Sequence, residues 1–201
     1  MSYGTTPRSI KLPQLLVPKC HIDSRGQFSE IFHEGRLHDN GITARFKQDN
    51  LSVSRRAATL RGLHFQLPPA AQAKLITVVK GRVLDVALDV RRGSPTYGEY
   101  VATELCSQTM HQLYVPVGFA HGFLTLEDDV VVMYKVSDYY SPKHDSGIRW
   151  NDPDVAVDWP KLADKVTISD KDRGLQLLSE FDSPFAYDGQ PLAPLSIVEI
   201  G

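Results

Sequence analysis

The chain has 201 residues, of which 42% are hydrophobic, so its length suits a single domain, residues 1–201, with a substantial core. Its 22 basic and 24 acidic residues give a net charge of -2, which argues against a nucleic-acid or membrane surface as the main partner. Two cysteines without CxxC spacing suit a reducing compartment, and the sequence has neither an apolar signal core nor an apolar run that could span a bilayer. We therefore expect a soluble, cytoplasmic protein.

Short segments with strand periodicity begin near the N-terminus. Residues 10–17 form the first, and Pro13 and Pro18 favour the edge of a sheet there. A turn with Arg25 leads into the alternating residues 27–32, and a helical turn is expected within 34–41. Residues 46–55 alternate again, with Gln48 and Asn50 on one face.

The clearest predicted hairpin joins residues 74–80 to 83–90 across Gly81 and Arg82. In its second strand Asp85 and Asp89 share one face, and the other face is apolar. Further strands are expected at 99–105, 111–115 and 130–136, a tight turn at 115–123 and a helix at 170–181, which Ser169 would cap. Many short strands between glycine and proline turns predict an all-β sandwich or barrel.

Residues 59–66 place a cation, a glycine, an imidazole and a carboxamide close together. On an ideal strand His64 and Gln66 share a face with Gly62, whereas Arg61 lies on the other face. The plain alternative is a hydrogen-bonded core histidine beside a solvated arginine.

A Pro-x-Gly-x-x-His pattern at 116–121 resembles the second motif of cupin barrels. Metal cupins carry His-x-His in the first motif, but here that position reads His64-Phe65-Gln66. Glutamine is a poor substitute for imidazole, so we expect no catalytic metal, and His121 is either a site residue or a structural histidine.

Tyr134 and Lys74 are polar residues on otherwise apolar strand faces. Tyr134 is in phase with valines, so a buried hydroxyl would need a polar partner, and opposite a histidine it would be a proton donor. Lys74 either points its ammonium into the barrel or marks a solvated strand end.

Together these motifs resemble the dTDP-4-dehydrorhamnose 3,5-epimerase family over about residues 23–178. They occur in family order, as Gln-Asp-Asn-Leu-Ser at 48–52, Leu-Arg-Gly-Leu-His-Phe-Gln at 60–66, Gln-Ala-Lys-Leu at 72–75, Ser-Pro-Thr-Tyr-Gly at 94–98, Pro-Val-Gly-Phe-Ala-His-Gly-Phe at 116–123, Tyr-Lys at 134–135, Tyr-Tyr-Ser-Pro at 139–142 and Trp-Asn-Asp-Pro at 150–153. The resemblance implies a cupin-like double-stranded β-helix (jelly-roll) barrel with a few short helices, mainly near the C-terminus. It also implies a homodimer that exchanges N-terminal strands, at about residues 10–33.

The implied activity is epimerisation at C3 and C5 of a dTDP-4-keto-6-deoxy sugar through an enolate, without a cofactor. By the family pattern His64 is the base, Tyr134 the proton donor and Lys74 the residue that stabilises the enolate. Asp172, or its competitor Asp170, orients His64.

The resemblance also assigns substrate contacts. Arg25 and Arg61 match diphosphate-binding arginines, and Phe28 and Tyr140 match aromatic residues near the thymine. Further substrate-contacting positions are Glu30, Gln48, Asn50, His121, Asp145 and Lys171.

Two departures from the family pattern leave the reaction's extent open. Ala73 stands where members often have glycine, and Asp145 where many have glutamate. The alternatives are a 3-epimerase, a non-catalytic sugar-nucleotide-binding cupin and a metal-dependent cupin dioxygenase. If Arg61 and His64 touch one substrate, the strand must bend or bulge at Gly62 to bring them to one side.

Overall fold

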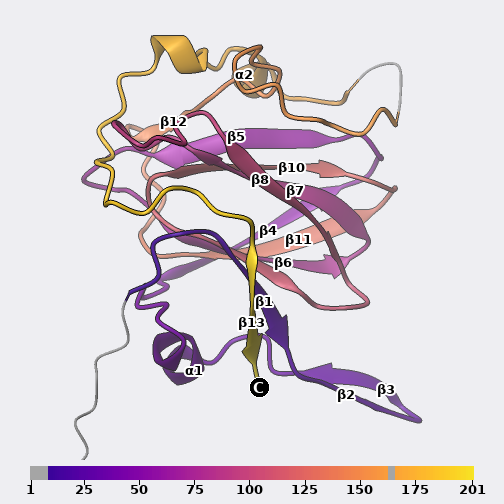
Figure 1. The fold of residues 1–201 in the computed structure, drawn as a ribbon. Helices are drawn as coiled ribbons and strands as arrows, with labels where there is room; N and C mark the ends of the chain where they lie inside the picture. The colour runs from indigo at the N-terminus through magenta and orange to yellow at the C-terminus, as the bar shows by residue number, and fades with distance from the viewer. Residues whose placement is uncertain (1–8, 163–165) are drawn as a thin grey trace, which may run out of the picture.

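The computed structural model describes residues 9–162 and 166–201, and two sheets face each other in it (Figure 1). The six-stranded sheet has the order β13 (Ser196–Ile200), β1 (Gln14–Pro18), β9 (Gln112–Val115), β6 (Lys74–Lys80), β11 (Val130–Val136) and β4 (Gln48–Ser54). The five-stranded sheet has the order β12 (Asp145–Gly147), β5 (Leu60–Gln66), β10 (Phe119–Thr125), β7 (Arg82–Asp89) and β8 (Tyr100–Cys106). The predicted all-β, cupin-like barrel is confirmed.

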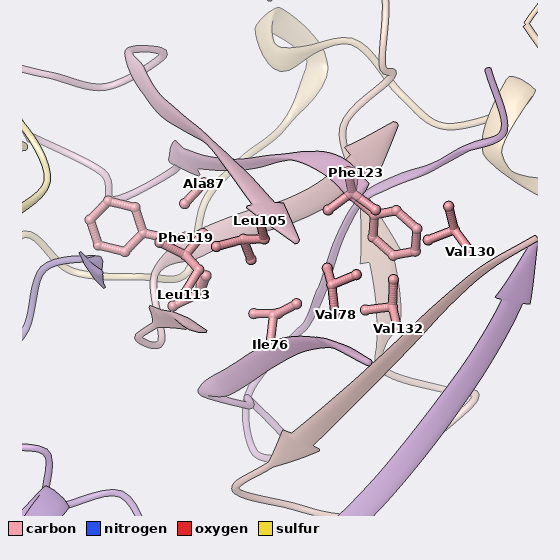
Figure 2. Close-up of a cluster of buried hydrophobic side chains, with 11 residues drawn as sticks. Ile76, Val78, Ala87, Leu105, Leu113, Phe119, Phe123, Val130 and Val132 are labelled. Atoms are coloured by element: carbon pink, nitrogen blue, oxygen red, sulfur yellow. The ribbon is translucent and has the colours of Figure 1, made fainter. Parts of the chain in front are cut away.

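The main core fills the space between the sheets (Figure 2). Ile76, Val78 and Val132 reach it from the six-stranded sheet, and Phe119 and Phe123 reach it from the other. Alternate residues of each strand point inward, so the period-two pattern of the sequence becomes this shared interior. Each such side chain stabilises the fold by about 1.5–3 kcal/mol.

The predicted hairpin between β6 and β7 is wrong. The two strands have nearly the expected bounds, but β6 pairs with β9 and β11, whereas β7 pairs with β8 and β10. Gly81, at φ +82°, carries the chain from one sheet to the other. An alternating pattern on both sides of a glycine fits either geometry, because both bury one face of each strand.

As predicted, Asp85 and Asp89 share one face of β7 and the apolar residues share the other. The structure shows which of the two faces points into the barrel. Val86 and Leu88 point outward and pack with Phe185 and other residues of the C-terminal layer. Ala87 points into the barrel core, and Asp85, on the same face, is fully buried. The acidic face of this strand is therefore the interior one.

The edge position predicted for the first strand is also wrong. β1 lies between β9 and the parallel strand β13, which the sequence did not reveal. Pro13 precedes β1 and Pro18 is its last residue, so neither proline interrupts the strand.

Two helical predictions have different outcomes. α1 (Glu34–Asp39) lies within the predicted segment. The helix predicted at 170–181 is wrong beyond its first turn: α2 (Asp170–Arg173) ends at Gly174, and a separate 3-10 turn, η1, spans Leu178–Glu180. Leu177 adopts an extended conformation between them, which breaks the helix.

The turn predicted at 115–123 ends earlier than expected. β10 already begins at Phe119, so His121 lies in a strand of the barrel wall. In the described part of the chain no helix is long and apolar enough to cross a membrane.

A small hairpin extends from the barrel. β2 (Cys20–Asp23) pairs with β3 (Gly26–Ser29), and the pair projects away from both large sheets (Figure 1). Ile22 and Phe28 are largely exposed on it.

Candidate active site

The bulge predicted at Gly62 is confirmed. His121 of β10 lies opposite His64 of β5, and Phe123 lies opposite Arg61, so three steps along β5 match two along β10. The extra residue reverses the parity of the strand and brings Arg61 and His64 to the same cavity, with Arg61 exposed. Gly62 has φ +133°, and a Cβ there would lie 2.5 Å from Gly122 Cα. The bond from Gly62 to Leu63 is a cis peptide.

His64 is held by a carboxylate. Its Nε2 lies 2.8 Å from Asp172 Oδ1, and the Gly62 backbone N–H donates to Asp172 Oδ2 at 3.1 Å. Burial alone would raise the pKa of Asp172, but the bonds from His64 and Gly62 lower it below its usual value. A neutral His64 that donates its Nε2–H to this carboxylate keeps the lone pair on Nδ1, as a base requires.

Of the two candidate aspartates, Asp172 is therefore the one that contacts His64. Ser169 caps α2 by accepting the Asp172 backbone N–H at 3.1 Å, which fixes the position of this acidic residue. Asp170 is exposed and lies 3.8 Å from Arg173.

A second histidine-aspartate pair lies beside the first. His121 Nε2 is 2.8 Å from Asp85 Oδ1, and both side chains are buried. Burial lowers the pKa of His121, although Asp85 acts in the opposite direction. The other carboxylate oxygen, Asp85 Oδ2, has no hydrogen-bond partner among the described residues.

Lys74 points into the barrel and does not mark a solvated strand end, so the first of the two interpretations of the sequence is confirmed. Its Nζ donates to the His64 carbonyl oxygen at 3.0 Å. Burial lowers the pKa of Lys74 to about 8, and the nearby carboxylates of Asp145 and Asp85 limit the shift. The ammonium thus remains charged at neutral pH but is close to titration.

Tyr134 stands on β11, next to Asn50 of β4 and Ile76 of β6 in register. Burial raises the pKa of its hydroxyl, and Arg61 acts against the increase. Tyr134 therefore keeps its proton at neutral pH.

Most of the predicted residues line a cavity with two adjoining lobes of about 430 and 370 Å³. His64, Lys74, Tyr134 and Lys171 line both lobes. Arg61, His121 and Asp172 complete the first lobe, and Gln48, Asn50, Tyr140 and Asp145 belong to the second.

Hydrogen bonds organise the second lobe. Asp145 accepts from the Tyr140 hydroxyl at 2.8 Å and forms an ion pair with Lys171. Gln48 donates to Asn50 Oδ1 at 2.8 Å and accepts the Tyr140 backbone N–H at 3.0 Å. Burial would lower the pKa of Lys171, but Asp145 raises it, so this lysine is a cation at the rim of the lobe.

Three predicted binding residues lie outside this cavity. Arg25 forms an ion pair with Asp23 at 2.6 Å on the small hairpin, and this contact lowers the pKa of Asp23. Phe28 is exposed beside them, and Glu30 pairs with Arg36 at 2.9 Å. A single chain thus does not bring Arg25, Phe28 and Glu30 to His64.

Sequence reasoning did not assign a role in the site to Asp85, and it predicted Ser169 only as a helix cap. The signal for Asp85 was its place, with Asp89, on the polar face of a strong apolar strand. Within residues 9–162 and 166–201, histidine, cysteine and acidic side chains form no group of three or more that could hold a metal ion.

Comparisons with known proteins show the family to which the chain is similar. The family model described as dTDP-4-dehydrorhamnose 3,5-epimerase matches residues 9–180. A dTDP-4-dehydrorhamnose 3,5-epimerase from Sinorhizobium fredii is 46% identical over 89% of this chain and 91% of its own.

Two crystal structures extend the comparison. The dTDP-6-deoxy-D-glucose-3,5-epimerase of Legionella pneumophila in complex with dTDP-4-keto-L-rhamnose has a TM-score of 0.83 and 40% identity, over 90% of this chain and 98% of its own. A 3'-monoepimerase from Streptomyces bikiniensis in complex with dTDP-quinovose has a TM-score of 0.78 and 33% identity, over 87% and 88%.

Proposed function

The chain belongs to the dTDP-4-dehydrorhamnose 3,5-epimerase family, and we propose that it converts dTDP-4-dehydro-6-deoxy-D-glucose to dTDP-4-dehydro-L-rhamnose. The observation that carries the proposal is the convergence of His64, oriented by Asp172, with Tyr134 and Lys74 on one cavity. These groups supply a base, an acid and a fixed cation, which are the needs of an isomerase that works through an enolate.

Proton transfer proceeds in two steps at each carbon. The C4 ketone acidifies the C3 and C5 protons, and His64 Nδ1 removes one of them to leave an enolate. The Lys74 ammonium stabilises the negative oxygen, with His121 beside it. Tyr134 then protonates the carbon from the opposite face, and the tyrosinate regains a proton from the solvent or the histidine. Each step moves only a proton, and the carbon atoms have the same oxidation state before and after the reaction, so the reaction requires no redox cofactor.

Binding of the nucleotide involves the rest of the cavity. We assign the diphosphate to Arg61, whose planar guanidinium suits bidentate phosphate contacts. We assign the second lobe to substrate contacts through Gln48, Asn50, Tyr140, Asp145 and Lys171, with the thymine near Tyr140.

We further propose a homodimer in which the N-terminal segment, residues 10–33, is shared through its hairpin: β2 and β3 reach the second copy, while β1 stays paired in its own barrel. The small hairpin projects from its own barrel (Figure 1), and Arg25 and Phe28, which it carries, are exposed and do not line the chain's own cavity. In the dimer these residues and Glu30 would complete the cavity of the second copy. The whole chain would then act as one cupin-like domain in the cytoplasm, where its free cysteines, Cys20 and Cys106, stay reduced.

Deuterium exchange tests the activity. The protein is incubated with dTDP-4-keto-6-deoxyglucose in deuterated water, and C3 and C5 are followed by NMR. We expect deuterium at both carbons, and its absence from both would refute the proposal. Exchange at C3 alone would identify a 3-epimerase, the activity named for the Streptomyces bikiniensis structure.

A matched variant separates catalysis from binding. His64→Ala should abolish exchange and leave dTDP affinity within about twofold, because the imidazole acts on the sugar. Unchanged exchange in this variant would favour a different base.

A further inference from the structure

The residues that follow the family match form a continuous segment along one side of the barrel. The match ends at residue 180, and residues 182–200 then run from the layer near η1 to the far edge of the six-stranded sheet (Figure 1). We call residues 182–200 the C-terminal strap.

The first part of the strap is fixed to the five-stranded sheet. Ser183 donates its hydroxyl to the Val90 carbonyl oxygen, and the Arg92 backbone N–H donates to the Phe185 carbonyl at 2.8 Å. Phe185 is buried, and its ring meets Phe65 edge-on at 5.7 Å. This end is therefore immobilised by both packing and backbone bonds.

The middle of the strap lies against the loop that follows β7 and against the main core. Asp188 pairs at 3.0 Å with Arg91, whose side chain is almost fully buried. The Leu192 backbone N–H donates to Thr96 Oγ1 at 2.8 Å, and Leu192 and Leu195 pack against the main core.

The last part of the strap ends beside the small hairpin. β13 pairs in parallel with β1, so that Ile200 lies opposite Pro18, and the Lys19 backbone N–H donates to the Ile200 carbonyl at 3.2 Å. Ile200 is buried with Leu16 and Tyr114. Lys19 is the one residue between β1 and β2, so the strap holds the point at which the hairpin leaves the barrel.

The other root of the hairpin is fixed separately. Gln112 donates to the Ile31 carbonyl at 3.0 Å, and the Phe32 ring packs edge-on against Phe46 at 5.9 Å. Between the two roots β2 and β3 pair with each other and expose Ile22 and Phe28. A projecting two-stranded ribbon has little stability of its own, so its direction depends on its roots.

We propose that the C-terminal strap is an assembly element, which fixes the entry root of the hairpin so that Arg25 and Phe28 are presented to a second copy of this chain. The strap thereby supports nucleotide binding in a cavity that it does not line. This inference rests on the exchanged homodimer proposed above.

Two isoleucines of β13 provide a matched test. Ile200 is 5% exposed and lies at the hairpin root, whereas Ile197 is 68% exposed on the same strand. We expect Ile200→Ser to raise the dissociation constant of the dimer about tenfold or more in sedimentation, and to weaken dTDP binding at low protein concentration. Ile197→Ser should match the unaltered protein in both measurements.

Hydrogen exchange on a milder variant, Ile200→Ala, distinguishes local loosening of the hairpin from unfolding of the whole barrel. With Ile200→Ala, amides of residues 20–29 should exchange faster, while β6 and β10 stay protected. Unchanged dimer affinity in both Ile200 variants, or equal weakening by Ile197→Ser, would overturn the role of the strap. An unaltered protein that is monomeric with full dTDP affinity would overturn the dimer, and neither result depends on whether C3 and C5 exchange.

Discussion

The contact between His64 and Asp172 can be tested by changing each of two neighbouring aspartates in turn. Asp172 contacts His64 at 2.8 Å, whereas Asp170, two residues earlier, is exposed. Asp172→Asn should lower kcat by about 10²–10⁴-fold, because an amide no longer stabilises the imidazolium and can favour the wrong tautomer.

The comparison is made by steady-state kinetics on both variants. Asp170→Asn should remain within about twofold of the unaltered protein, since it keeps the same α2 cap and changes one surface charge. Equal losses of kcat in both variants would show that activity depends on the negative charge of this turn and not on the contact between Asp172 and His64.

Lys74 links activity to pH. Its pKa is lowered to about 8, so the cation that stabilises the enolate is lost as the pH rises through that value. We expect kcat to fall on the alkaline side with an apparent pKa near 8, measured in a pH-rate profile. A flat profile up to pH 10 would contradict this environment for Lys74.

The same shift predicts an opposite effect on stability. Because the folded-state pKa of Lys74 lies below the usual 10.5, the unfolded chain binds more protons between about pH 8 and 10.5, and Lys74 makes the free energy of unfolding rise with pH there. At pH 7 the full penalty is present, on the order of 3 kcal/mol.

Lys74→Met should therefore increase the free energy of unfolding at pH 7, by up to about 3 kcal/mol, while it abolishes activity. Denaturant titration measures this, with Lys80→Met at the exposed end of the same strand as the control. A less stable Lys74→Met protein would show that its contact with the His64 carbonyl outweighs the burial penalty.

At the scale of the element, the bulge in β5 decides whether the site exists. Gly62 combines φ +133° with a backbone neighbour 2.5 Å from an added Cβ. Gly62→Ala should lower the free energy of unfolding by about 3 kcal/mol or more and reduce activity, because β5 must shift away from β10.

Gly93→Ala is the control for this variant. Gly93 also has positive φ, at +81°, but an added Cβ there meets nothing within 4 Å. Its expected loss is about 1–2 kcal/mol with activity retained. If both variants lose the same stability, the positive φ alone explains the loss at Gly62, and the close approach of Gly122 contributes nothing.

Sequence periodicity predicted most strands well, since alternation survives wherever one face is buried. It did not distinguish a hairpin from a passage between sheets at Gly81, because both geometries bury one face of each strand. The strand Ser196–Ile200 was missed because its pairing with β1 joins residues far apart in sequence.

The same limits apply to the site. The bulge at Gly62 was predictable because Arg61 and His64 needed the same cavity. The pairing of His121 with Asp85 was not, since it depends on the register between β10 and β7. The choice between Asp170 and Asp172 could not be made from the sequence, because it depends on which side of the short helix α2 faces His64.

At the scale of the whole molecule, complementation tests the exchange of strands. His64→Ala and Arg25→Ala variants should each be weak, but a mixture that is unfolded and refolded together should regain about one quarter of full activity. Each mixed dimer then has one site with both residues intact. If Arg25 serves its own chain, the mixture should stay as weak as its parts, and refolding each variant alone is the control.

The two strands that pair with β1 determine when during synthesis the six-stranded sheet can finish folding. Residues 14–18 leave the ribosome early, but they pair with residues 112–115 and 196–200. One side of β1 therefore remains an open edge until residues 112–115 are made, and the other side until residues 196–200 are made, and such unpaired strands are prone to misassociate. β1 can therefore gain its second neighbour, and with it a fixed root for the hairpin, only after residues 196–200 have been synthesised.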